Sequence, residues 1–98
     1  MKKKLELIFK DEANIEVLEA YLYYENELEG LGERFLNELD RVILAINLTP
    51  NGFQKFHNGT RQIPTDVFPY VVVYKVEGKS LVIFAVFQTQ QDPERKIR

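Results

Sequence analysis

Two apolar segments in the second half of the chain constrain the fold more than any other feature. Residues 68–76 (FPYVVVYKV) and 81–87 (LVIFAVF) are apolar at nearly every position, and the polar stretch 77–80 (EGKS) joins them. A strand with one face in water alternates apolar and polar residues, whereas strands this apolar require cover on both faces. The segments therefore predict a β-hairpin with two buried faces. The remaining residues are too few to cover both, so the hairpin also indicates a partner.

The first half of the chain predicts a strand followed by two helices. Residues 5–10 alternate in polarity, which predicts an edge strand. Asp11 is the predicted N-cap of a helix over residues 12–28, because its carboxylate can accept from the free amides of the first turn. One face of this helix is apolar and is formed by Ala13, Val17, Ala20, Tyr21, Tyr24 and Leu28. A second stripe, which predicts packing on more than one neighbour, is formed by Ile15, Leu18 and Leu22.

A second helix is predicted over residues 31–47, after a turn marked by Gly30 and Gly32, and Pro50 prevents it from continuing. The short link makes the two helices an antiparallel hairpin. The predicted core stripe of this helix is Leu31, Phe35, Leu39, Val42 and Ile46. A short strand over residues 60–65 precedes the two apolar strands. The predicted fold class is therefore α+β: a strand, an α-helical hairpin and a three-stranded antiparallel meander, with the helices packed on one face of the sheet.

Length and composition predict a single domain over residues 1–98. A chain that is 45% hydrophobic and 29% charged at this length can form one core. The absence of cysteine fits a reducing compartment, and no segment approaches the ~20 apolar residues of a membrane span. We therefore expect a cytoplasmic protein without a membrane partner. His57 is the single histidine and cannot form a metal site alone, so neither a metal nor a cofactor is expected.

Charge is divided unevenly between the two halves of the chain. Residues 1–48 carry six basic and eleven acidic side chains, whereas residues 49–98 carry seven basic and four acidic ones. The overall formal charge of −2 gives no general case for a nucleic-acid binder. A polyanion would meet the second half of the chain. The alternative is an accidental asymmetry of a solvated surface.

Short motifs follow one another along nearly the whole chain: Tyr23-Tyr24-Glu25, residues 30–36 (GLGERFL), Thr49-Pro50, Arg61, Phe68-Pro69-Tyr70, Tyr74 and residues 87–93 (FQTQQDP). Their order, together with the predicted elements, resembles the RelE/ParE toxin superfamily, specifically its ParE-like plasmid-stabilization branch. The resemblance implies a small toxin from a bacterial toxin-antitoxin pair. It also implies a cognate antitoxin whose chain wraps over the toxin and neutralises it.

Two activities occur in this superfamily. RelE-like toxins cleave messenger RNA on the ribosome, which requires a proton-transfer group and cations near the developing phosphorane charge. The resemblance places Val71 and the pair Gln90-Gln91 where those nucleases carry basic residues, and Gln88 where related toxins often carry a histidine. These uncharged side chains argue against a nuclease. The expected function is that of ParE, which poisons DNA gyrase by binding it; a ribosome-dependent mRNA endonuclease of RelE type and an inactive or repurposed homologue remain the alternatives.

The residues expected to contact the target are Arg61, Gln88, Gln91, Arg95, Lys96 and Arg98. Arg61 has a family-like position at the start of the second strand, and it is equally suited to tying the preceding loop to Asp66 or to a helix acid. The three basic residues at the end form either a phosphate-binding tail or a solubilising terminus. No catalytic residue is expected. The tyrosines at positions 24, 70 and 74 are expected to pack in the core rather than to form a stacking platform.

The partner is expected on the sheet face that the helices leave open. Alternation along the two strong strands assigns to that face the side chains of Val71, Val73, Val82, Phe84 and Val86. An exposed patch of this size exceeds what monomers normally leave in water. The expected occupant is an amphipathic antitoxin segment, or a second copy of the chain, giving a homodimer, when the antitoxin is absent.

Overall fold

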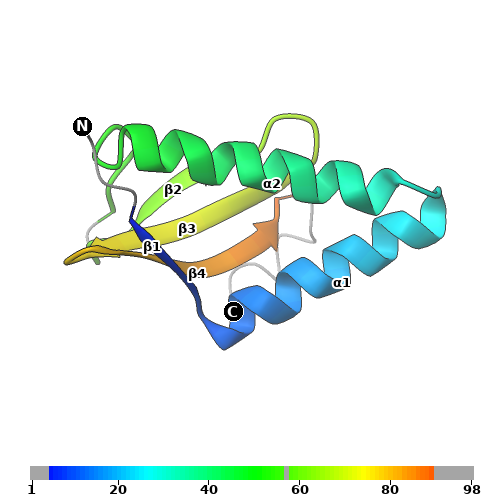
Figure 1. Cartoon of the computed structure of the whole chain (residues 1–98), viewed down its shortest axis with the longest axis horizontal. Helices are drawn as coiled ribbons and strands as arrows, with labels where there is room; N and C mark the ends of the chain where they lie inside the picture. The colour runs from blue at the N-terminus through cyan, green and yellow to red at the C-terminus, as the bar shows by residue number, and fades with distance from the viewer. Residues whose placement is uncertain (1–4, 57, 90–98) are drawn as a thin grey trace.

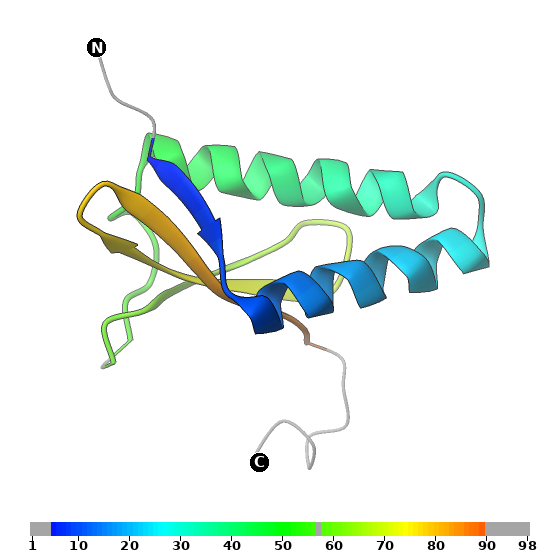
Figure 2. The ribbon, with the colours of Figure 1, turned by 60° about the horizontal axis from the view of Figure 1, so that its bottom comes forward.

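A computed structural model describes residues 5–56 and 58–89. The elements are β1 (Glu6–Phe9), α1 (Asp11–Glu27), α2 (Leu31–Leu48), β2 (Arg61–Pro64), β3 (Tyr70–Glu77) and β4 (Ser80–Gln88) (Figure 1). This order confirms the predicted α+β class. In both views the two helices diverge from their connecting turn, and β1 lies across the open end between them (Figures 1 and 2).

The sheet has the strand order β1-β4-β3-β2. The last three strands form the predicted antiparallel meander, and β1 is the predicted edge strand. β1 runs parallel to β4 and pairs with only the first part of it, residues 80–83. The outer edge of β4 beyond Ile83 therefore has no strand beside it among the described residues.

The core lies between α2 and the sheet, as the apolar stripe of the second helix predicted. Phe35, Leu39, Val42 and Ile46 are buried on α2, and Leu31 packs partly against them. From the sheet, the fully buried side chains in this core are Val72, Tyr74, Leu81, Ile83 and Val86. Tyr70 is buried in the same cluster, and Tyr24 packs against it. The assignment of these tyrosines to the core is confirmed.

α1 is much less buried than its sequence indicated. Only Ala13 and Ala20 are buried, although Val17 and Tyr24 also pack against the core. The second stripe is largely exposed rather than packed on a second neighbour among the described residues: Ile15, Leu18 and Leu22 are 55%, 57% and 50% exposed. The predicted core position of Leu28 is also wrong, since its side chain is exposed. A hairpin of two helices contacts the sheet with one side of α1, and none of the described residues covers the opposite side.

The N-terminus of α1 lacks the predicted cap, whereas the turn between the two helices lies at the predicted Gly30 and Gly32. Lys10 occupies the N-cap position with no side-chain cap, and Asp11 is already the first residue of the helix, so the predicted cap is wrong. At the turn, the carboxylate of Glu25 accepts hydrogen bonds from the backbone N–H groups of Gly30 (2.8 Å) and Gly32 (2.9 Å). Any side chain at Gly32 would meet the backbone oxygen of Tyr21 at 2.7 Å, so glycine sets the close approach of the two helices.

A β-bulge in β4 changes which side chains face the helices. Val73 is opposite Ala85, but Tyr74 is opposite Ile83, so Phe84 is the extra residue. Simple alternation is therefore broken at this position. Val86 pairs with Val72 and is fully buried in the core, on the same side of the sheet as Ile83. The prediction that placed Val86 on the open face is wrong, because the bulge shifts the alternation by one residue.

Candidate functional site

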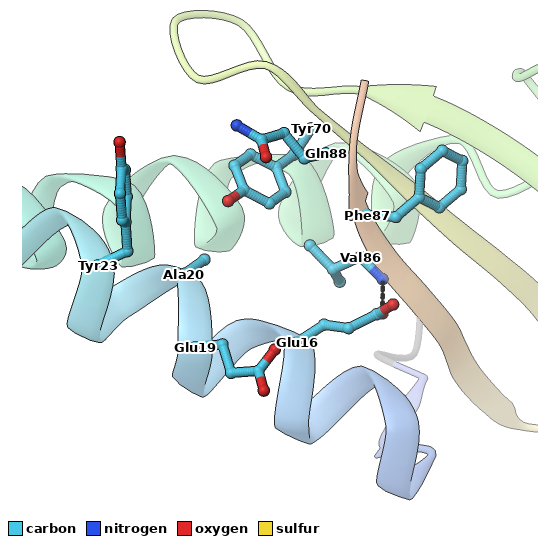
Figure 3. Close-up of a pocket in the computed structure, with 8 residues that line it drawn as sticks. All are labelled: Glu16, Glu19, Ala20, Tyr23, Tyr70, Val86, Phe87 and Gln88. Carbon is cyan, nitrogen blue, oxygen red and sulfur yellow. Dashed lines mark hydrogen bonds between the residues drawn. The ribbon is translucent and has the colours of Figure 1, made fainter. Parts of the chain in front are cut away.

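A groove of about 410 Å³ lies between α1 and the outer edge of β4 (Figure 3). It exists because β1 leaves this edge free after Ile83 and α1 runs beside it instead. α1 contributes Glu16, Glu19, Ala20 and Tyr23 to the lining. The sheet contributes Tyr70, Val86, Phe87 and Gln88. In Figure 3, Phe87 points to the other side of β4 from Tyr70 and Gln88, as the strand alternation requires.

Glu16 connects the two walls of the groove. Its Oε1 accepts a hydrogen bond of 2.7 Å from the backbone N–H of Val86, a donor on the strand edge that β1 does not reach (Figure 3). Burial raises the pKa of Glu16, the Val86 hydrogen bond opposes this rise, and the nearby carboxylates of Glu12 and Glu19 add to it. The carboxylate therefore satisfies a backbone group at an unpaired sheet edge, which natural proteins usually protect.

Replacing Glu16 with glutamine is expected to raise the melting temperature at about pH 7 and to change it little at about pH 3. Because the pKa of Glu16 is raised above 4.5 on folding, the folded chain binds the proton more tightly, and stability falls as the pH rises through that range. Glutamine keeps an acceptor for Val86 without the charge. Thermal melts at the two pH values measure the effect, with Glu6→Gln on β1 as the exposed control. A lower melting temperature for Glu16→Gln at neutral pH would contradict the prediction.

Two of the tyrosines, Tyr70 in the groove lining and Tyr24 outside it, pack in the aromatic part of the core. Tyr24 packs edge-on against Phe68 with ring centroids 4.8 Å apart, and the ring centroid of Tyr70 lies 5.1 Å from that of Phe35. Burial raises the pKa of both Tyr24 and Tyr70, so neither hydroxyl serves as a base near neutral pH. Tyr23 is the exposed member, 56% accessible at the rim. The groove thus presents hydroxyl, amide and carboxylate groups, and none of its described lining residues is basic.

Of the predicted target-contact residues, the structure describes Arg61 and Gln88, and these two lie apart. Gln88 lies in the groove opposite Tyr70, whereas Arg61 lies on the other side of β3, opposite Tyr74. Gln91, Arg95, Lys96 and Arg98 lie outside the described residues, as does His57. The prediction for these four target contacts therefore stays a prediction.

Arg61 holds the loop that precedes β2. Its Nη1 donates a 2.8 Å hydrogen bond to the carbonyl oxygen of Phe53, and the hydroxyl of Tyr74 donates one of 2.9 Å to that of Pro50. Burial raises the pKa of Tyr74, and the charge of Arg61 opposes that rise. The alternative in which Arg61 ties down the loop is therefore the one observed, with backbone carbonyls as acceptors rather than Asp66 or a helix acid.

The predicted partner face is less exposed than expected. Val71, Val73 and Phe84 are only partly accessible, and Val82 is buried at 5% exposure. With Val86 in the core, three of the five predicted side chains remain accessible to a partner. The exposed large apolar side chains lie chiefly on β1 and the helices: Leu7, Ile8, Ile15, Leu18, Leu22, Tyr23, Leu44 and Leu48.

Glu38 is a buried acid that sequence reasoning missed. It is 3% exposed on α2, and its Oε2 accepts from the backbone N–H groups of Val67 (2.7 Å) and Phe68 (3.1 Å). Its spacing in the sequence indicates burial, since Glu38 lies three residues after Phe35 and four before Val42, both on the core stripe. An acid at that spacing faces the interior and needs donors there. Those donors come from a loop that no local pattern identifies.

The chain is thus an α+β protein, in which a two-helix hairpin packs on a four-stranded sheet with the first strand parallel at the edge. Residues 7–93 match the family described as the ParE toxin of type II toxin-antitoxin systems, parDE, and the chain belongs to that family. It is thus the toxin component of a type II system.

A solved structure described as "Chromosomal ParDE TA system from P. aeruginosa" has the same fold, with a TM-score of 0.76. At 14% identity, the match covers 89% of this chain and 98% of that chain. A search of curated protein sequences found no match. Within the described residues, no cluster of three or more metal-ligating side chains occurs, and no helix is long and apolar enough to cross a membrane.

Proposed function

We propose that this toxin acts in the cytoplasm by binding a macromolecular target such as DNA gyrase, without cutting RNA. The observation that carries the proposal is the charge of the groove between α1 and β4. Its described lining includes the carboxylates of Glu16 and Glu19 and no lysine or arginine. A phosphodiester that entered it would meet negative charge, whereas RNA cleavage needs cations against the phosphorane.

The positions of Val71 and Gln88 support the same proposal. Val71 is opposite Phe87 on the face of the sheet away from the helices, and Gln88 is opposite Tyr70 on the helix side. A basic residue restored at Val71 would therefore point away from Gln88 and from the groove. Arginine at this one position is not expected to create a nuclease.

Expression of the chain without its antitoxin is expected to arrest growth, and the purified protein is expected to inhibit gyrase supercoiling. Transcripts from the same cells should show no codon-specific cuts. Growth, supercoiling and transcript cleavage are measured separately, because growth arrest alone does not distinguish gyrase inhibition from mRNA cleavage. Codon-specific cuts by the wild-type chain that Arg61→Ala abolishes would establish the RelE-type alternative. Unaffected growth and supercoiling would assign the chain to the inactive homologues.

The proposed partner is a cognate antitoxin, and both the family membership and the fold shared with a ParDE system support it. Its gene is expected beside that of the toxin. Val71, Val73 and Phe84 remain proposed contacts on the second face of the sheet for the antitoxin or, in its absence, for a second copy of the chain. Sedimentation of the isolated protein, with Val71→Lys for comparison, tests the homodimer.

A further inference from the structure

The outer side of α1 combines an apolar stripe with an unusual charge pattern. Ile15, Leu18 and Leu22 lie one above another at helical spacing, and each side chain is at least half exposed. Single exposed apolar residues are ordinary, but an aligned row on one helix is a surface on which another helix can pack. The row is unpartnered among the described residues.

Acids surround this row, and no base accompanies them. α1 carries Asp11, Glu12, Glu16, Glu19, Glu25 and Glu27 and contains no lysine or arginine. Asp11, Glu12 and Glu19 lie three or four residues from Ile15, and Glu19 and Glu25 lie three residues from Leu22. Residues at these spacings are neighbours on a helix surface. Carboxylates therefore lie beside Ile15 and Leu22, at the two ends of the stripe.

These carboxylates lack cationic partners within the described part of the chain. The ion pair found there, Lys75 with Glu77 at 3.9 Å, lies on β3. Lys10 directly precedes α1, but its ammonium lies 5.6 Å from the ring centroid of Phe84 on β4. Glu16 and Glu25 bond to backbone amides, whereas Asp11, Glu12 and Glu19 are exposed. Neither Lys10 nor Lys75 therefore neutralises the carboxylates beside the stripe.

We propose that the outer face of α1 binds a basic amphipathic helix of the antitoxin, with apolar residues on Ile15, Leu18 and Leu22 and lysines or arginines against Asp11, Glu12 and Glu19. This inference rests on the proposed pairing with an antitoxin. The charge pattern selects the occupant, because complementary charge steers association and like charge opposes it. A second copy of this chain would bring two acidic borders together, so self-association through this face is disfavoured.

The first test is the sequence of the adjacent small reading frame. It should encode a segment with apolar residues at three- and four-residue spacing, flanked by lysine or arginine. A product whose amphipathic segments are all bordered by acids would overturn the inference and leave the toxin-antitoxin pairing intact.

The second test measures the dissociation constant of the purified toxin and the product of that reading frame by calorimetry. Leu18→Lys and Leu22→Lys are expected to weaken binding at least about a hundredfold, because each places a cation in an apolar contact facing basic side chains. Leu44→Lys is the matched control: it is an equally exposed leucine, 55% accessible, on α2. It should bind as the wild type does. Circular dichroism and melting temperature confirm that the variants remain folded.

The double variant Glu12→Gln with Glu19→Gln separates charge from packing. It is expected to weaken binding about tenfold at low salt and to make the affinity less dependent on salt, since two screened attractions are removed. Wild-type affinity in all three α1 variants, or equal weakening by Leu44→Lys, would overturn the inference. A wild-type toxin that binds no product of the neighbouring frame would refute the proposed pairing itself, so the two failures are distinguishable.

Discussion

Replacing Phe35 with alanine is expected to lower the free energy of unfolding by about 3 to 5 kcal/mol, the range for deleting a buried phenylalanine. The side chain is 1% exposed, and its ring centroid lies 5.1 to 5.7 Å from those of Tyr24, Phe68 and Tyr70. These rings come from α1, from the 65–69 loop and from β3. One deletion would therefore leave a cavity where three parts of the fold meet. Urea denaturation followed by circular dichroism measures the loss.

Leu44→Ala is the matched control for Phe35→Ala, because Leu44 is on the same helix with its side chain exposed. Its effect should stay within about 0.5 kcal/mol, as for most surface substitutions. A loss below about 1 kcal/mol for Phe35→Ala would show that the aromatic cluster does not support the core.

Replacing Glu38 with alanine is expected to cost about 2 to 4 kcal/mol, because the carboxylate satisfies two backbone donors and hydrogen bonds to charged groups each contribute more than neutral ones. The N–H groups of Val67 and Phe68 would lose their acceptor, and Phe68 itself is buried. Amide hydrogen exchange measures the protection of these two N–H groups, and denaturant unfolding measures the loss of stability.

Two further variants interpret the Glu38 result. Glu38→Gln retains an acceptor oxygen and should lose less stability than Glu38→Ala. Glu33→Ala removes an exposed acid from the same helix and should be nearly neutral. Unchanged exchange at Val67 and Phe68 in Glu38→Ala would mean that the carboxylate does not hold the loop.

The order of the elements and the buried side of α2 were predictable because both depend on local patterns. Phe35, Leu39, Val42 and Ile46 repeat at helical spacing, and the helix buries that stripe. The two apolar strands were equally clear. Parallel pairing of β1 with β4 was not predicted, because nothing in a four-residue strand specifies its neighbour or its direction.

The face assignment in β4 failed at a bulge. Phe84 inserts one residue relative to β3, so Val86 turns into the core although period-two counting places it outside. A bulge depends on how two strands pair, so the polarity pattern of one strand does not show where a bulge occurs. The bulge accounts for Val86, whereas Val82, the other buried member of the predicted face, pairs with Ile8 of β1 and Lys75 of β3.

The groove itself was beyond sequence reasoning, since its key contact joins distant residues. The bond from Val86 to Glu16 spans 70 positions, and the bonds to Glu38 span 29 and 30. In sequence, Glu16 reads as an ordinary acid near the start of a helix. The apolar spacing of Ile15, Leu18 and Leu22 predicts burial against a neighbour in this chain, whereas the structure leaves these side chains at least half exposed.

Because β1 pairs with β4, this part of the sheet cannot form until β4 has been synthesised. β1 and α1 leave the ribosome before residues 80–83, which pair with β1, have been made. The helical hairpin has local contacts and can form first, whereas the distant pairing must wait and is slow to close. Until β4 arrives, the side of α1 destined to face it is uncovered, and incompletely folded chains with exposed apolar surface aggregate readily. An antitoxin that is already present during translation would therefore meet the nascent toxin while its sheet is still open.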